Sequence, residues 1–166
     1  MKKTILMIFT FYCLLSEILF SMNSQEVKVG LDVFLVNHLS KLEGKRVGII
    51  TNQTGIASSG EHIVDILSSI EGLSIVALYA PEHGIRGDLP DATKMASYVE
   101  KRTGIQVWSL YGEHLKPTQE MLEDVDVLIY DIQDVGARFY TFISTMGLAM
   151  EAASEYGKQF IVLDRP

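Results

Sequence analysis

Five short apolar segments recur along the chain, each bounded by residues that favour turns. They are rich in β-branched residues and almost continuous in hydrophobicity, instead of alternating between polar and apolar positions. This pattern is typical of strands that are covered on both faces of a parallel sheet. We therefore expect strands over residues 46–51, 73–79, 105–110, 125–130 and 160–163.

Apolar residues at helical spacing fill the stretches between these strands. The first such stretch, 29–42, is expected to form a helix with Val33, Val36 and Leu39 directed toward the core. Alternation of strands and helices predicts an α/β fold with a mostly parallel sheet, right-handed crossovers and flanking helices. The remaining helices are expected over 61–70, 118–122 and 143–156, with Thr118 as an N-cap and Gly157 as a C-cap.

The first residues have the pattern of a secretory signal peptide. Lys2 and Lys3 precede an apolar run over 5–15, which is too short for a membrane span of about 20 residues. The alternative is a buried N-terminal helix. We expect a signal peptide over 1–24, containing the single cysteine, Cys13, and an exported mature domain over 25–166.

The composition and net charge limit the kinds of ligand and partner that the chain is expected to bind. The chain has 166 residues, of which 48% are hydrophobic, and its formal net charge is −7. No basic stripe is present to neutralise phosphates, so a nucleic-acid partner is not expected. One cysteine excludes a disulfide framework, and no metal-ligand spacing or glycine-rich phosphate loop occurs. We expect neither a metal nor a cofactor.

Polar segments follow each predicted strand directly. Parallel strands bring their carboxyl ends to one rim of the sheet, where ligands bind. The pattern therefore predicts a polar small-molecule or glycan site at that rim. The segments begin with Asn52, Ala80, Tyr111, Asp131 and Asp164, the last followed by Arg165.

The segment around Glu82 is the sharpest of these features. Pro81 and two nearby glycines favour tight turns, which crowd Glu82, His83 and Arg86 onto one short loop. A carboxyl group there is suited to general acid catalysis if its pKa is raised, whereas an ion pair with Arg86 suits a base or nucleophile. The alternative is a loop-stabilising ion pair without a catalytic role.

The segment over 131–141 is the second feature. Asp131 directly follows a strand, Arg138 is suited to grip a carboxylate, and Tyr140 to stack on a sugar. The alternative gives Asp131 a capping role and Arg138 a local ion pair. Elsewhere, we expect Trp108 in the core, His62 and His114 at the surface, and Glu151 on the last helix as a second carboxylate or a solvent-facing residue.

Several longer strings resemble one known family. TNQTG, APEHGIRGDLPDA, WSLYGEHLKPTQEML, DVDVLIYDIQDVGARFYTFISTMGLAMEAA and FIVLDRP are similar to the NamZ-type exo-β-N-acetylmuramidases, over nearly all of residues 29–166. The resemblance implies a glycoside hydrolase that releases N-acetylmuramic acid from the non-reducing ends of peptidoglycan fragments. It also implies a Rossmann-like catalytic domain, truncated here before a smaller C-terminal domain, with a cleft between the two.

The resemblance assigns roles to the candidate residues. It implies Glu82 as the first catalytic carboxylate, with Glu151, or less readily Asp131, as the second. An arginine is expected to bind the lactyl carboxylate of the sugar. Two rival functions are an inactive or glycan-binding fragment and a nucleotide-binding module. The residues expected to bind substrate are Asn52, His83, Arg86, Arg138, Tyr140 and Arg165.

Overall fold

The computed structural model describes residues 27–87 and 97–166. The predicted signal peptide over 1–24, with Cys13, lies outside these residues and stays a prediction. Within the described ranges, none of the helices has the length and apolar character needed to cross a bilayer.

A six-stranded sheet in the order β3-β4-β2-β1-β5-β6 forms the centre of the fold. Every neighbouring pair is parallel except β3 and β4, which are antiparallel. This confirms the predicted α/β class with a mostly parallel sheet. The strands are β1 (Arg46–Thr51), β2 (Ser74–Ala80), β3 (Tyr98–Val99), β4 (Gln106–Ser109), β5 (Val127–Asp131) and β6 (Gln159–Val162).

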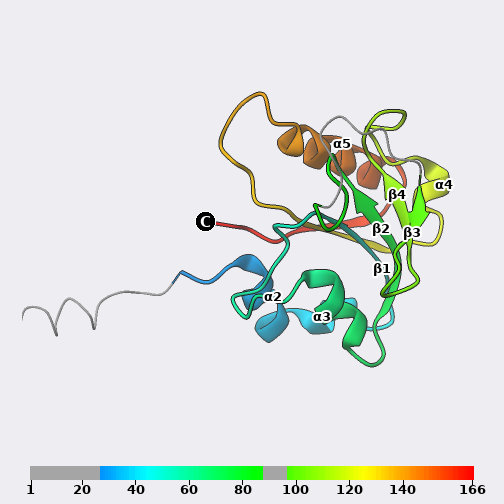
Figure 1. The fold of residues 1–166 in the computed structure, drawn as a ribbon. Helices are drawn as coiled ribbons and strands as arrows, with labels where there is room; N and C mark the ends of the chain where they lie inside the picture. The colour runs from blue at the N-terminus through cyan, green and yellow to red at the C-terminus, as the bar shows by residue number, and fades with distance from the viewer. Residues whose placement is uncertain (1–26, 88–96) are drawn as a thin grey trace, which may run out of the picture.

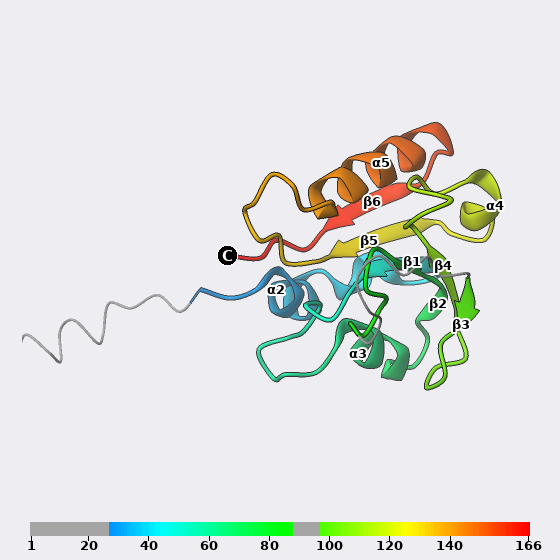
Figure 2. The same ribbon diagram turned by 45° about the horizontal axis from the view of Figure 1, so that its top comes forward.

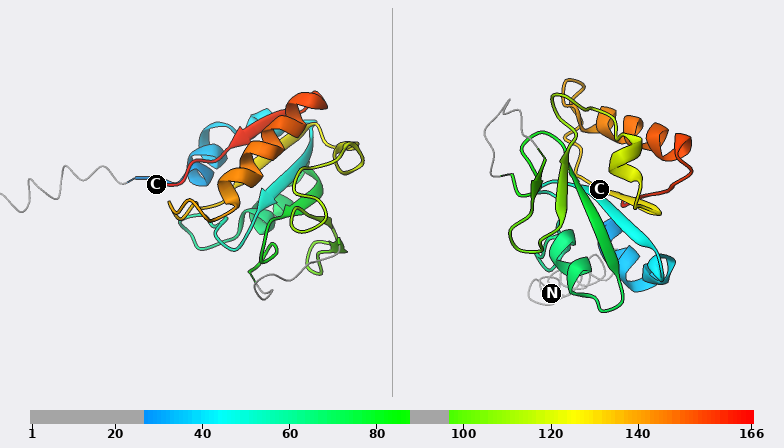
Figure 3. Two further views of the ribbon diagram at one scale, coloured as in Figure 1. Left: turned by 90° about the horizontal axis from the view of Figure 1, so that it is seen from above. Right: turned by 90° about the vertical axis from the view of Figure 1, so that its right-hand side faces the viewer.

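Helices cover both faces of the sheet. Figure 1 shows α2 (Gly30–Asn37) and α3 (Ile63–Ser69) on one side, and α5 (Phe142–Glu155) on the other. The short helix α4 (Gln119–Leu122) lies on the side of α5, and the 3-10 helix η1 (Leu39–Leu42) follows α2. The further views in Figure 3 show the same three layers. The side chain of Thr118 accepts a hydrogen bond from the Met121 N–H, which confirms the predicted cap.

The core consists of two apolar clusters, one on each face of the sheet. Leu31 and Phe34 of α2 pack with Leu67 of α3 on one face, and Phe142 and Ala149 of α5 contribute to the other. All five residues of β5 are buried, as expected of a central strand covered on both sides. Continuous hydrophobicity in the sequence therefore reflected burial on both faces.

Two details differ from the predictions. Val36 is 81% exposed, so the expectation that it points toward the core is wrong; Phe34 is buried instead. The chain also leaves the α-helix after Asn37 and continues as η1, which changes the direction of the inward face. The antiparallel strand β3 was not predicted, because two residues are too few to show a period.

The segment before α2 lies beside the end of β6 (Figure 1). The Gly30 N–H donates a hydrogen bond to the Asp164 carbonyl oxygen at 2.6 Å. A Cβ atom at position 30 would lie only 2.4 Å from the Asp164 backbone nitrogen. Only glycine fits there, so this contact fixes how α2 packs against the last strand.

We predict that Gly30→Ala lowers the free energy of unfolding by about 1–3 kcal/mol, because the backbone of Leu163 and Asp164, directly after β6, must move to admit the methyl group. Gly147→Ala is the matched control: position 147 is a helical glycine with open space around it. Alanine there should raise the free energy of unfolding by roughly 0.5–1 kcal/mol. Urea denaturation measures both, and equal effects would contradict the proposed close packing.

Candidate functional site

The polar loops that follow the parallel strands meet at one rim. Figure 2 shows the arrowheads of β5 and β6 pointing toward the same end of the sheet. The Thr54 hydroxyl, after β1, accepts a hydrogen bond from the Gln133 N–H, after β5, at 2.8 Å. Gly87, in the loop after β2, lies against the side chain of Gln53. The loops after β2, β1 and β5 thus form one continuous surface, as predicted.

Asn52 lies where the strand order reverses. From β1 the chain adds β2 and β4 on one side and later β5 on the other, and the helices that follow β1 and β5, α3 and α5, lie on opposite faces of the sheet (Figure 1). The Asn52 Oδ1 accepts hydrogen bonds from the Thr54 N–H at 2.9 Å and its hydroxyl at 2.6 Å. The residue is fully buried, and its Nδ2 has no hydrogen-bond partner among the described residues.

Glu82 lies in a tight turn after β2. The Gly84 N–H donates to the Pro81 carbonyl oxygen at 3.2 Å, which places Glu82 and His83 at the two central positions. His83 has φ of 75°, a left-handed conformation that costs free energy in any residue except glycine. Both side chains are half-buried. Strain of this kind concentrates at functional sites, which makes this turn the leading candidate.

Arg86, in the same loop, makes a bidentate ion pair with Asp65 of α3, both nitrogen–oxygen distances being 2.8 Å. Glu100 lies 3.7 Å from the guanidinium. Hydrogen bonds from Arg86 hold the pKa of Asp65 below its ordinary value. Arg86 therefore anchors the loop to α3, which matches the loop-stabilising alternative with Asp65 as the partner.

Asp131 and Arg165 form a second bidentate pair, in the interior. The two nitrogen–oxygen distances are 2.6 and 2.8 Å, and the guanidinium also donates to the Ile56 carbonyl oxygen at 3.1 Å. The side chain of Asp131 is 0% exposed and that of Arg165 is 5% exposed. Burial raises the pKa of Asp131, and the guanidinium of Arg165 opposes this effect. Neither charged side chain is presented to solvent.

An exposed aromatic pair stands on the loop after β5. The Phe139 ring is 84% exposed and its centroid lies 5.2 Å from that of Tyr140, which is 43% exposed. Arg138 is exposed beside them, and no ion pair of its guanidinium occurs in the part of the chain that the structure describes. The local ion pair considered for Arg138 is thus not found within 27–87 and 97–166.

Glu151 lies well along α5. It is about two and a half turns from the start of the helix at the rim. Its carboxylate is 58% exposed and lies 3.0 Å from the Lys116 ammonium group. The structure therefore places Glu151 on an exposed face of α5, beside a lysine.

His62 is buried, so the expectation that it lies at the surface is wrong. Its Nε2 lies 2.9 Å from the Asn52 carbonyl oxygen, and its Nδ1 accepts a hydrogen bond from the Val64 N–H at 3.3 Å. One signal was present in the sequence: His62 directly precedes the apolar face of a helix, where capping residues occur. His114 is exposed and Trp108 packs against the core, as expected.

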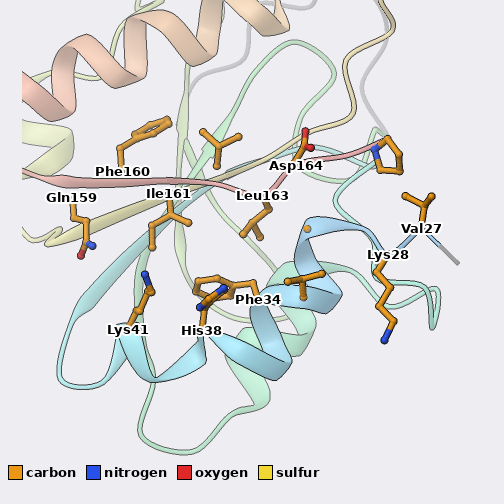
Figure 4. Close-up of a pocket in the computed structure, with 14 residues that line it drawn as sticks. Val27, Lys28, Phe34, His38, Lys41, Gln159, Phe160, Ile161, Leu163 and Asp164 are labelled. Carbon is orange, nitrogen blue, oxygen red and sulfur yellow. The ribbon is translucent and has the colours of Figure 1, made fainter. Parts of the chain in front are cut away.

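A separate groove of about 540 Å³ runs between α2 and the outer edge of β6 (Figure 4). Phe34, His38 and Lys41 face Ile161 and Leu163 across it. None of the predicted site residues lines this groove. Across residues 27–87 and 97–166, no three histidine, cysteine, aspartate or glutamate side chains gather in a way that could hold a metal ion.

Comparison with known proteins identifies the family. The family model described as exo-beta-N-acetylmuramidase NamZ, N-terminal, matches residues 47–166. The chain belongs to the NamZ family. The match is to the N-terminal part of the family, in agreement with the resemblance of the motifs. All nine candidate site residues lie within the matched range.

Individual NamZ relatives extend this result. The peptidoglycan beta-N-acetylmuramidase NamZ of Bacillus subtilis is 50% identical over 141 residues, which are 85% of this chain and 34% of the relative. A DUF1343 family protein from Bacteroides fragilis is 53% identical, with a TM-score of 0.76 over 84% of this chain and 34% of its own. A second protein of that family and organism is 34% identical, with a TM-score of 0.70 over 86% of this chain and 35% of its own. The chain spans about a third of the length of these relatives.

We predict that Arg165→Met lowers the free energy of unfolding by about 3–5 kcal/mol, because it leaves the carboxylate of Asp131 buried without a partner. Replacing both members, Asp131→Leu with Arg165→Met, should recover part of this loss. Arg138→Met, at an exposed arginine, should change the free energy of unfolding by less than about 0.5 kcal/mol. Thermal and urea unfolding test all three variants, and a mild effect of Arg165→Met would show that the pair is dispensable.

Proposed function

We propose that this chain carries the catalytic acid of an exo-β-N-acetylmuramidase, which releases N-acetylmuramic acid from the non-reducing ends of peptidoglycan-derived muramyl glycans. The observation that carries the proposal is the 50% identity to the peptidoglycan beta-N-acetylmuramidase NamZ. The strained turn that presents Glu82 at the ligand-binding rim supports it. The reaction is the hydrolysis of a glycosidic bond, for which two carboxyl groups or one carboxyl group and the substrate suffice.

Glu82 is the general acid in this proposal. The ion pair of Arg86 with Asp65 anchors the loop that carries Glu82 to α3, which supports a defined position for this turn. Glu82 donates its proton to the leaving glycosidic oxygen as the bond to the anomeric carbon breaks. His83, the next residue in the turn, borders the same position.

The substrate itself is the preferred second group. Both oxygens of Asp131 are bound by Arg165, and Glu151 is paired with Lys116 on the outer face of α5. Muramic acid carries a 2-acetamido group, whose carbonyl oxygen attacks the anomeric carbon in substrate-assisted glycosidases. The structure supports this route over one in which Asp131 or Glu151 acts as nucleophile.

Arg138 is the preferred partner of the lactyl carboxylate. Arg86 and Arg165 are each committed to an aspartate, whereas Arg138 is exposed on the rim. The neighbouring Tyr140 ring offers a face on which a sugar can stack. Substrate recognition on this side therefore combines a cation with an aromatic surface.

A second candidate function is binding without hydrolysis. The chain spans only about a third of its relatives, and the resemblance implies a cleft completed by a C-terminal domain. Calorimetric titration of the 166-residue chain with N-acetylmuramic acid, together with a hydrolysis assay on a chromogenic muramide, separates the two functions. Binding without turnover favours the glycan-binding fragment.

The proposal also includes export of the chain from the cytoplasm, with removal of a signal peptide. Lys2, Lys3 and the apolar run over 5–15 are the basis for it, and the predicted cleavage follows residue 24. Expression in a bacterium with an intact secretion system should give a protein outside the cytoplasm that lacks these residues. N-terminal sequencing measures this, and recovery of the uncleaved chain in the cytoplasm would contradict it.

We predict that Glu82→Gln lowers kcat for a chromogenic muramide by at least about 100-fold, because the amide has no acidic proton to donate. The fold should be unaffected, since Glu82 lies in a half-buried surface turn. Glu113→Gln is the matched control, because Glu113 is a rim glutamate whose side chain is 91% exposed. Normal turnover by Glu82→Gln would show that another group is the acid.

The same assay separates the routes for the second group. If the reaction is substrate-assisted, Glu151→Gln should keep the wild-type kcat. If Glu151 is catalytic, Glu151→Gln should lower kcat as much as Glu82→Gln does. Proton NMR of the first product formed shows whether the anomeric configuration is retained, as substrate assistance requires.

A further inference from the structure

His62 uses both nitrogens of its ring. Its Nε2 lies 2.9 Å from the Asn52 carbonyl oxygen, which has no proton, so Nε2 carries the hydrogen and donates it. Its Nδ1 accepts from the Val64 N–H and is therefore unprotonated. Only the neutral imidazole with hydrogen on Nε2 satisfies both contacts.

These two contacts join the end of β1 to the first turn of α3. The Asn52 carbonyl is held by His62 and the Asn52 side chain by Thr54, which in turn binds the Gln133 N–H of the loop after β5. His62 is thus the buried end of a chain of hydrogen bonds that holds the loop over residues 52–55, where the strand order reverses. The buried Nδ2 of Asn52 is the one donor in this chain left without a partner among the described residues.

The charges around His62 do not favour its protonation. Burial lowers the pKa of the imidazole most, the hydrogen bond to the Asn52 carbonyl oxygen raises it, and the nearby guanidinium of Arg86 lowers it further. Asp65 and Asp131 raise it, but each of these carboxylates is already paired with an arginine. Glu61, the preceding residue, is exposed and its carboxylate interacts with the Ser59 hydroxyl.

We propose that His62 is a positioning residue of the rim site, whose neutral ring joins the loop over 52–55 to the first turn of α3 and whose protonation breaks this link at the α3 end. A proton on Nδ1 would face the Val64 N–H, so two donors would meet and the cap of α3 would be lost. The imidazolium would keep its hydrogen bond to the Asn52 carbonyl oxygen, but the ring would no longer be anchored to α3. The loop over 52–55 would lose this support, and the rim site would bind an amino-sugar ligand more weakly. The choice of ligand rests on the proposed function, but the positioning role does not.

His62→Asn tests the role directly, since asparagine retains a cap for α3 but is too short to reach the Asn52 carbonyl as well. We expect the variant to unfold at nearly the wild-type temperature at pH 7.5, yet to bind N-acetylmuramic acid at least tenfold more weakly. His114→Asn, at an exposed histidine, is the matched control and should bind as the wild type does. Wild-type affinity in His62→Asn would overturn the proposal.

Titration of the wild-type chain by NMR provides a test without ligand. The His62 ring should keep hydrogen on Nε2 at pH 7.5 and titrate below 6.5, the ordinary value for histidine, with the Thr54 and Val64 amide signals shifting at the same midpoint. An unfolded chain takes up this proton more readily, so the free energy of unfolding should fall as the pH drops below about 6.5, and less so in His62→Asn. Thr54 signals that do not follow the titration of His62 would overturn the positioning role.

The two tests fail in different ways. If the wild type binds no muramyl ligand while the Thr54 amide follows His62, the proposed function is wrong and the positioning role stands. If the ligand binds and neither the Thr54 amide nor the affinity depends on His62, the positioning role is wrong and the proposed function stands.

Discussion

The rim depends on the buried ion pair between Asp131 and Arg165. The planar guanidinium meets both carboxylate oxygens and also the Ile56 carbonyl, so one side chain connects the ends of β5 and β6 to the loop after β1. The backbone carbonyl of Asp131 accepts a further hydrogen bond, at 2.8 Å, from the Thr51 hydroxyl at the end of β1. Because these hydrogen bonds hold the strand ends together, the loops that follow the strands can carry strain and exposed side chains without loss of the fold.

Three arginines near the rim have different tasks, which the sequence alone does not distinguish. Arg86 and Arg165 are bound by carboxylates 21 and 34 residues away along the chain. Such partners are brought close only by the strand order, so no local pattern announces them. Arg138 lacks such a partner within the described residues and is presented to solvent. The motifs include all three arginines, and the geometry separates the two that are paired with buried or half-buried carboxylates from the one that is exposed.

The strands and long helices could be predicted because burial leaves a periodic record in the sequence. β1 was predicted to the residue, and the other predicted strands within about two residues at each end. Val36 and His62 were misjudged for different reasons. Residues 33–36 are all apolar, so helical spacing alone does not decide which of them face the core. The contact between His62 and Asn52 arises from tertiary packing, which has no period along the chain.

The two edges of the sheet differ. One edge ends in β3, a strand of two residues, whereas the other ends in β6, a strand of four residues that pairs only with β5 among the described residues and leaves Val162 46% exposed. An additional strand would therefore find more unpaired backbone groups at β6 than at β3. A further parallel strand at that side would add its own carboxyl end to the existing row of loops, and in concentrated solution the same unpaired backbone groups would favour association between molecules.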